Sequence, residues 1–163
     1  MQVLFYVFVT VATFLLTELS AWAMHKYVMH GPLWKWHEDH HRPDLRNGFF
    51  EKNDRFFMVY AIPSAALYIA GTNTPYFWLF FVGLGISLYG LAYFLIHDVY
   101  IHRRFSWFRH LDNRYSRAIL RAHGNHHVVQ TKEDSESFGL LLVDKKYFGS
   151  RKDWAREASE SSK

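Results

Sequence analysis

Long apolar runs alternate with charge-rich stretches along this chain, and the apolar runs predict its main elements. The first run extends from Val3 to Met24 and holds one charged residue, Glu18. As a helix it is long enough to cross a hydrocarbon core of about 30 Å. It exceeds the roughly 7–15 apolar residues of a cleaved signal peptide, and no basic residue precedes it. We therefore expect a retained membrane-spanning helix.

Two further apolar runs follow in the middle of the chain. The run from Phe56 to Gly71 is short and contains Pro63, so we expect a kinked, tilted or partly inserted helix. The run from Tyr76 to Ile96 carries no charge and is the clearest span in the chain. Only residues 72–75 separate these runs, and their helix-breaking residues predict a tight turn.

The predicted fold class is all-α, an integral membrane helical bundle that forms one domain of residues 1–163. A chain of 163 residues has room for one domain. The mean hydropathy of −0.16 resembles that of a soluble protein only because charged stretches offset the apolar runs. Residues 144–163 are charged and end in a serine-rich stretch. We expect them to form a polar C-terminal tail on the surface, partly disordered.

The basic residues predict the orientation of the bundle. All 19 Lys and Arg residues lie outside the apolar runs, between Lys26 and Arg55 or from Arg103 onward. Three spans place these two segments on the same side, which the positive-inside rule makes cytoplasmic. A net charge of +4 alone is compatible with nucleic-acid binding, but 50% apolar residues fit a membrane protein better. We expect membrane lipid as a partner and no nucleic acid.

Ten of the eleven histidines follow one pattern that occurs twice, HxxxxH and then HxxHH. The first copy comprises His25, His30, His37, His40 and His41, and the second comprises His97, His102, His123, His126 and His127. Only His110 stands apart. Each copy begins where an apolar run reaches the predicted cytoplasmic side. We therefore expect both copies to meet in a histidine-rich cap that holds metal, since neutral imidazole is a common metal ligand.

The two spacings differ in what they predict on a helix. In HxxHH the first histidine lies three and four residues from the others, so all three share a face and can point at a common centre. In HxxxxH the rings are roughly 140° apart on a regular α-helix. They are expected to serve different ions or to lie where the helix ends, which Gly31 and Pro32 support after His30. Ten imidazoles suggest two ions with about five ligands each.

The identity of the metal stays open at this point. The chain has no cysteine, so any ligands are nitrogen or oxygen atoms. Imidazole suits zinc, copper, iron and nickel alike. Structural zinc sites close with four ligands and do not need ten histidines. Soluble di-iron bundles use a Glu-x-x-His motif from each of two helices together with further glutamates, whereas this sequence has that spacing only once, at Glu38–His41.

Several acidic residues lie close to the histidine pattern. Glu38, Asp39 and Asp98 can accept a hydrogen bond from the second nitrogen of a ligand ring, or they can be solvated surface charges. Glu18 precedes His25 by two helical turns and shares its face. An ionisable residue inside a span indicates a bundle interior or a functional role. The alternative is a charge at a helix end near the lipid headgroups.

The motifs resemble those of the bacterial beta-carotene hydroxylases, in the integral-membrane fatty acid hydroxylase superfamily with its histidine boxes. The resemblance rests on "HKYVMHG" at His25–Gly31, "HEDHH" at His37–His41, "FFEKND" at Phe49–Asp54, "YFLIHDVYIHRR" at Tyr93–Arg104 and "AHGNHH" at Ala122–His127, with a weaker match in "SFGLL" at Ser137–Leu141. These segments cover most of the chain from Glu18 to about Leu141, in the order of that family.

The resemblance implies a di-iron monooxygenase in a bacterial inner membrane, with its site at the cytoplasmic face. Two non-haem irons would be held by the ten box histidines, with O2 as co-substrate. The implied reaction hydroxylates the 3-position of beta-ionone rings, from beta-carotene through beta-cryptoxanthin to zeaxanthin, on carotenoid taken from the bilayer. Reduced ferredoxin or a similar external donor would supply electrons. The sequence shows no flavin, haem or nicotinamide motif of its own.

Three other functions compete with this interpretation. A fatty acid or sterol hydroxylase or desaturase would use the same metal site on another lipid. A histidine-rich membrane metal-binding or transport protein would place its ligands within the spans near mid-membrane, whereas these gather at one end. A haem protein with two axial histidines would leave most of the ten unexplained.

Two groups of residues are candidates for handling the substrate and the electron donor. The aromatic residues of the third span can line a lateral path for the substrate or serve as packing residues; they are Phe77, Trp78, Phe80 and Tyr89. The basic residues of the second cytoplasmic segment can dock an acidic electron carrier or anionic lipid; they are Arg103, Arg104, Arg109, Arg114 and Arg117.

Overall fold

A computed structural model describes residues 1–46, 48–107 and 110–149 of the chain. Within these residues all regular secondary structure is helical, as predicted. Three helices are long and apolar enough to cross a bilayer, at Gln2–Met29, Lys52–Asn73 and Trp78–Ile101. They confirm the three predicted spans, and the first and third extend further toward the histidines than the apolar runs do.

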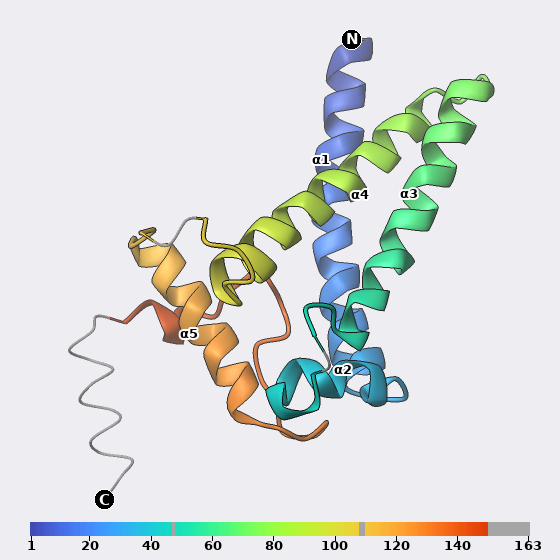
Figure 1. The fold of residues 1–163 in the computed structure, drawn as a ribbon. Coiled ribbons are helices and arrows are strands. Elements are labelled where there is room, and N and C mark those ends of the chain that lie inside the picture. Colours follow the sequence, from blue (N-terminus) through green and yellow to red (C-terminus); the bar gives the residue numbers. More distant parts are fainter. Residues whose placement is uncertain (47, 108–109, 150–163) are drawn as a thin grey trace, which may run out of the picture.

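The long helices form an upright bundle whose lower end is covered by two shorter ones (Figure 1). The bundle consists of α1 (Gln2–Ala23), α3 (Phe56–Asn73) and α4 (Trp78–Tyr93), and the cap contains α2 (Trp34–His41) and α5 (Arg114–Val128). Two π-helices, Met24–Met29 and Phe94–Ile101, continue α1 and α4 into the cap. Short 3-10 turns lie at Pro43–Leu45, Lys52–Arg55 and Lys145–Phe148.

Small residues let α4 pack closely against both of its neighbours. A Cβ atom at Gly85 would lie 2.6 Å from the carbonyl oxygen of Thr10 in α1, and one at Gly83 would lie 3.0 Å from that of Ser64 in α3. The Ser64 hydroxyl donates to the Gly83 carbonyl at 2.9 Å. Close approach at glycine and hydrogen bonds from serine are typical of helices that associate within a bilayer.

The second predicted span forms one helix despite its proline. α3 runs from Phe56 to Asn73 with Pro63 inside it, and the turn at Lys52–Arg55 leads directly into it. Its outer face leaves large apolar side chains such as Phe57, Ile62 and Ile69 exposed, as does that of α1. Such surfaces suit lipid rather than water. The chain is therefore an integral membrane protein.

The aromatic residues considered for either a substrate path or packing lie mostly at the end of the bundle far from the cap. The turn between α3 and α4 lies near the N-terminus, at the opposite end from α2 and α5 (Figure 1). Phe77 lies at this turn, with its ring 5.7 Å from that of Tyr6 in α1, and Trp78 and Phe80 are in the first turn of α4. Only Tyr89 lies further along α4 toward the cap.

The last described residues pack more tightly than the predicted surface tail. Tyr147 is 2% exposed and lies in a small core with Ala118 and Ala122 of α5. The segment that ends at residue 149 therefore belongs to the cap, because an aromatic ring gains free energy when α5 removes it from water. The rest of the predicted tail, residues 150–163, lies outside the residues that the structure describes.

The close approach at Gly85 predicts a specific loss of stability. Replacing Gly85 by Ala should destabilise the bundle by about 1–3 kcal/mol, because the added methyl group overlaps the backbone of α1. The matched control is Gly90→Ala on the same helix, where a Cβ meets only Phe57 Cε2 at 3.9 Å. Thermal unfolding in detergent should show a lower Tm for G85A alone. Equal Tm values for the two variants would contradict the packing described here.

Candidate metal centre

The π-helices bring the two histidines of each HxxxxH motif together. In a π-helix a backbone N–H donates to the carbonyl five residues back, so residues i and i+5 lie one above the other. The N–H of His30 donates to the His25 carbonyl at 3.0 Å, and that of His102 donates to the His97 carbonyl at 2.9 Å. The ring centroids are 5.2 Å apart in the first pair and 4.5 Å apart in the second.

The prediction that these paired histidines serve different ions is therefore wrong. The angle of roughly 140° assumed α-helical geometry, and both pairs lie where α-helix has given way to π-helix. The alternative, that they lie where the helix ends, is correct. His30 and His102 each follow the last residue of a π-helix.

The histidines converge into two groups of potential metal ligands. The first cluster comprises His25, His30, His37, His41 and His126, and the second cluster comprises His40, His97, His102 and His123. Within each cluster the potential ligand atoms lie within 4.8 Å of one another. His127 adjoins the second cluster, since its Nε2 lies 2.8 Å from that of His123. His110 is exposed and takes no part.

Each HxxHH motif is divided between the two clusters. In α2, His37 and His41 belong to the first cluster and His40 to the second. In α5, His123 belongs to the second and His126 to the first. The expectation of one common centre for each motif is therefore wrong. Positions i+3 and i+4 differ by about 100° around a helix axis, so a helix between two clusters can supply both.

The first cluster has its ligand atoms fixed by hydrogen bonds on the outer side. All five of its Nδ1 atoms face carbonyl oxygens: His25 at Phe138 (3.0 Å), His30 at Lys132 (3.1 Å), His37 at the Asn53 side chain (2.7 Å), His41 at Val129 (2.9 Å) and His126 at Glu136 (2.7 Å). A carbonyl oxygen only accepts, so each Nδ1 carries the proton. In a neutral ring, Nε2 is then an unprotonated lone pair.

These lone pairs point at one another inside the cluster. The Nε2 atom of His37 lies 3.0 Å from that of His25 and 3.2 Å from that of His41. Those of His30 and His126 are 3.3 Å apart. No proton remains to join them, because both rings of each pair already use theirs on the outer side. A cation at the centre resolves this repulsion, so the donor set fits a metal ion.

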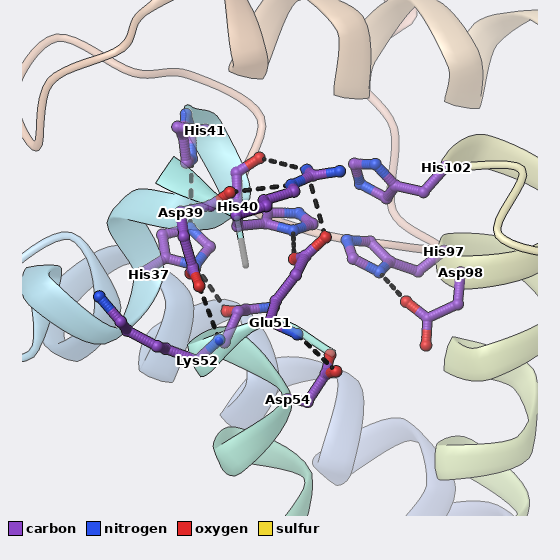
Figure 2. Close-up of polar contacts among 12 residues, drawn as sticks. His37, Asp39, His40, His41, Glu51, Lys52, Asp54, His97, Asp98 and His102 are labelled. Atoms are coloured by element: carbon purple, nitrogen blue, oxygen red, sulfur yellow. Dashed lines mark hydrogen bonds and ion pairs between the residues drawn. The ribbon is translucent and has the colours of Figure 1, made fainter. Parts of the chain in front are cut away.

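The second cluster also contains a nitrogen atom that lacks a partner. His40 Nδ1 donates to Glu51 Oε2 at 2.7 Å and His97 Nδ1 donates to Asp98 Oδ1 at 2.8 Å (Figure 2). The opposite nitrogen of His40, Nε2, is buried and has no hydrogen-bond partner among the described residues. A buried polar atom in that state costs about 1–3 kcal/mol, and coordination to a metal ion would remove the cost.

Burial keeps the cap histidines in the form that binds metal. Burial is the largest cause that lowers the pKa of His40 and His123 well below the usual value, and repulsion by neighbouring imidazoles adds to it. Burial likewise lowers the pKa of His41 to about 4 and that of His127 to about 3. At neutral pH these rings are uncharged, which leaves one nitrogen of each free to coordinate.

Glu18 lies in the bundle interior, as its position within a span indicated, and not at a helix end. It is 3% exposed. Its Oε1 accepts from the three backbone N–H groups of residues 140–142 at 3.1, 2.8 and 3.2 Å, and its Oε2 accepts from the Tyr89 hydroxyl at 2.7 Å. The carboxylate thereby holds the segment whose Phe138 carbonyl orients His25.

Of the three acidic residues considered either as acceptors for ligand rings or as surface charges, the structure places one against a histidine. Asp98 accepts from His97. Glu38 instead pairs with Arg42 at 3.3 Å near the surface. Asp39 is buried, but its Oδ2 accepts from the backbone N–H of Lys52 at 2.7 Å.

Two residues that orient histidines were not identified from the sequence. Glu51 and Asn53 contact His40 and His37 from the segment that leads into α3. This segment has no helical or strand period that would show which side chains face the histidines. The only available signal was the resemblance of "FFEKND", which gave these residues no role.

The basic residues proposed for docking are partly engaged within the protein. Arg104 donates to both carboxylate oxygens of Asp54 at 2.9 Å and to the Phe49 carbonyl at 2.8 Å. Arg117 pairs with Asp112 at 2.6 Å. Arg109 lies outside the described residues. Arg104 is therefore a structural residue of the cap rather than a free surface charge.

The sequence comparisons agree with this site. The profile of the fatty acid hydroxylase family matches residues 10–149, which include every histidine of both clusters. The chain belongs to the fatty acid hydroxylase family. In a family of hydroxylases, two buried groups of imidazole lone pairs indicate a metal site.

Relatives of this fatty acid hydroxylase family member are found in bacteria and plants. A beta-carotene hydroxylase of Paracoccus sp. (strain PC1) is 39% identical over 139 residues, which cover 83% of this chain and 82% of the relative. One from Pantoea ananas is 42% identical over 138 residues, which cover 84% and 75%. A chloroplastic beta-carotene 3-hydroxylase of an Oncidium hybrid cultivar is 40% identical over 129 residues, which cover 77% and 41%. No solved structure matches with significance.

The contacts of Glu18 predict that its loss detaches the segment at residues 140–142. Glu18→Ala leaves three backbone N–H groups without an acceptor, at about 1–3 kcal/mol for each group that stays buried. Limited proteolysis in detergent should cut this segment much faster in the variant. Tyr89→Phe is the control, since it removes one hydrogen bond and keeps the carboxylate. Equal cleavage rates for E18A and the wild type would contradict the role assigned to Glu18.

Proposed function

We propose that this chain is a non-haem di-iron monooxygenase that hydroxylates the 3-position of carotenoid beta-ionone rings. Beta-carotene would be converted through beta-cryptoxanthin to zeaxanthin. The observation that carries the proposal is the pair of adjacent buried histidine clusters at one end of a membrane bundle. Support comes from the hydroxylase family and from relatives whose names state beta-carotene hydroxylase.

The ten box histidines are proposed as the ligands of two irons. One ion would be held by the five residues of the first cluster, and the other by the four of the second cluster with His127 as a fifth. Structural zinc normally closes with four ligands. Imidazole also suits iron, and the hydroxylase family makes iron the better choice.

The irons would supply the activation of O2. One oxygen atom would enter a C–H bond of the ring, and the other would leave as water after taking up two electrons from the external donor and two protons. The residues of the chain prepare the site for this chemistry. Carbonyl oxygens hold the Nδ1 protons on the outer side, so the Nε2 atoms stay aimed inward. Burial of the rings excludes bulk water. The apolar substrate would reach the cap from the bilayer.

The proposed location is a bacterial inner membrane, with the cap on the cytoplasmic side and residues 1–163 acting as one domain. All Lys and Arg residues lie in the two segments beside the cap or after it, which the positive-inside rule assigns to the cytoplasm. A ferredoxin-type donor would then reach the cap from the cytoplasm, where acidic carriers are attracted to basic surfaces.

A fatty acid or sterol as substrate of the same metal site is the second candidate. The family profile carries the name fatty acid hydroxylase, and the geometry of the clusters is compatible with any lipid that is hydroxylated near the membrane surface. A metal transporter is less consistent with the structure, because both clusters lie at one end of the bundle rather than at its midpoint.

Expression in cells that accumulate beta-carotene tests the proposed substrate. Pigment analysis should show beta-cryptoxanthin and zeaxanthin, because the site is expected to act on both rings. Unchanged beta-carotene in the presence of folded, iron-loaded protein would contradict the carotenoid assignment and favour another lipid.

The same pigment assay tests the proposed ligands by comparing histidine variants inside the clusters with one outside them. Either His40→Ala or His126→Ala removes a buried ring from a cluster, and hydroxylated pigment should fall by about 100-fold or more. Loss of a residue that only hydrogen-bonds to a metal ligand already lowers metal affinity or activity by about 10–100-fold. Iron content should fall as well. His110→Ala, at an exposed position, should retain both. A fully active H126A variant would remove that residue from the ligand set.

A further inference from the structure

The two clusters differ in the charge of the groups that accept their Nδ1 protons. In the first cluster every acceptor is neutral, being either a backbone carbonyl or the side-chain amide of Asn53. In the second cluster the acceptors of His40 and His97 are the carboxylates of Glu51 and Asp98. Figure 2 shows both carboxylates aimed at their histidines from different segments of the chain.

Both carboxylates are held in place by further contacts. The second oxygen of Glu51 lies 3.2 Å from an Arg46 guanidinium nitrogen, and that of Asp98 lies 3.8 Å from Arg104. The cations contact the oxygens that do not face the histidines, so they favour the ionised carboxylates while leaving the acceptor oxygens on the rings. Glu51 also caps the turn at Lys52–Arg55, which fixes its backbone.

A carboxylate that accepts from Nδ1 draws the proton away from the ring and makes Nε2 a stronger electron donor. The metal that receives these electrons is stabilised in its more oxidised state. Burial does not cancel the difference, because the rings of both clusters are shielded to a similar degree: His37 and His41 are 1% and 2% exposed, and His40 and His97 are 2% and 3% exposed.

We infer that Glu51 and Asp98 are positioning residues whose charge makes the two irons unequal, so that the iron at the second cluster is the more easily oxidised. This inference rests on the proposed function, since it requires iron at both clusters. With His127 as its fifth imidazole, the second cluster is proposed to supply as many histidines as the first, so the charge of the acceptors is the difference to be tested. The experiment must therefore change the charge without changing the number of histidines.

A redox titration of the iron-loaded holoenzyme, followed by Mössbauer spectroscopy with 57Fe, measures each iron separately. The wild type should show two one-electron steps. Glu51→Gln keeps the size of the side chain and removes its charge. In this variant the step at the lower reduction potential should shift toward higher potential by about 59 mV or more, which corresponds to a factor of about 10 in its equilibrium constant. The step at the higher potential should stay unchanged.

The reciprocal variant places a charge on the first cluster. Asn53→Asp gives His37 a carboxylate acceptor of the same size, and the upper step should shift by a similar factor toward lower potential. Both variants should therefore reduce the difference between the two reduction potentials, E51Q by raising the lower potential and N53D by lowering the upper one. Damage to the fold alone would instead change both steps and lower the iron content. Should E51Q not retain two irons, Asp98→Asn replaces it, with the same shift expected through His97.

The outcomes separate this inference from the proposed function. A shift of the upper step in E51Q, or potentials that stay unchanged in E51Q and N53D with two irons bound, would overturn the inference alone. A wild type with fewer than two irons would overturn both. Shifts in the expected directions in a protein that leaves beta-carotene unchanged would support the inference and reject the carotenoid substrate.

Discussion

The cap depends on one electrostatic constraint. Neutral imidazole rings converge there with their lone pairs facing one another. The five Nδ1 protons of the first cluster are committed to carbonyl oxygens, so these rings have no proton left to share between their inward nitrogen atoms. A cation at the centre of the cluster satisfies all of them at once. Close packing of α4 at Gly83 and Gly85 brings the π-helical ends of α1 and α4 to the cap, and Glu18 holds the segment that orients His25.

The division of each HxxHH motif makes the two clusters structurally dependent on one another. α2 contributes His40 to a cluster otherwise supplied by the second half of the chain, and α5 contributes His126 to a cluster otherwise supplied by the first half. Neither cluster can therefore form from one half of the sequence alone. This exchange places two unequal sets of acceptors side by side.

The sequence predicted the parts of the fold that follow from local pattern. Run length and the scarcity of charged residues identified three spans, and the repeated spacing identified the histidines that gather at one end. It did not predict the π-helices, because HxxxxH was interpreted in α-helical geometry. Glu51 and Asn53 were missed because they come from a segment without periodicity. The carbonyl of Phe138 was missed because any residue supplies one, so its identity carries no signal.

The most direct test of the account is X-ray absorption at the iron edge of purified, iron-loaded protein, combined with an iron count. Two caged ions predict about two irons per chain, each with a first shell dominated by nitrogen and with the outer-shell scattering that imidazole rings produce. A single iron, or a first shell composed mainly of oxygen, would contradict the central claim that ten histidines form a pair of metal sites.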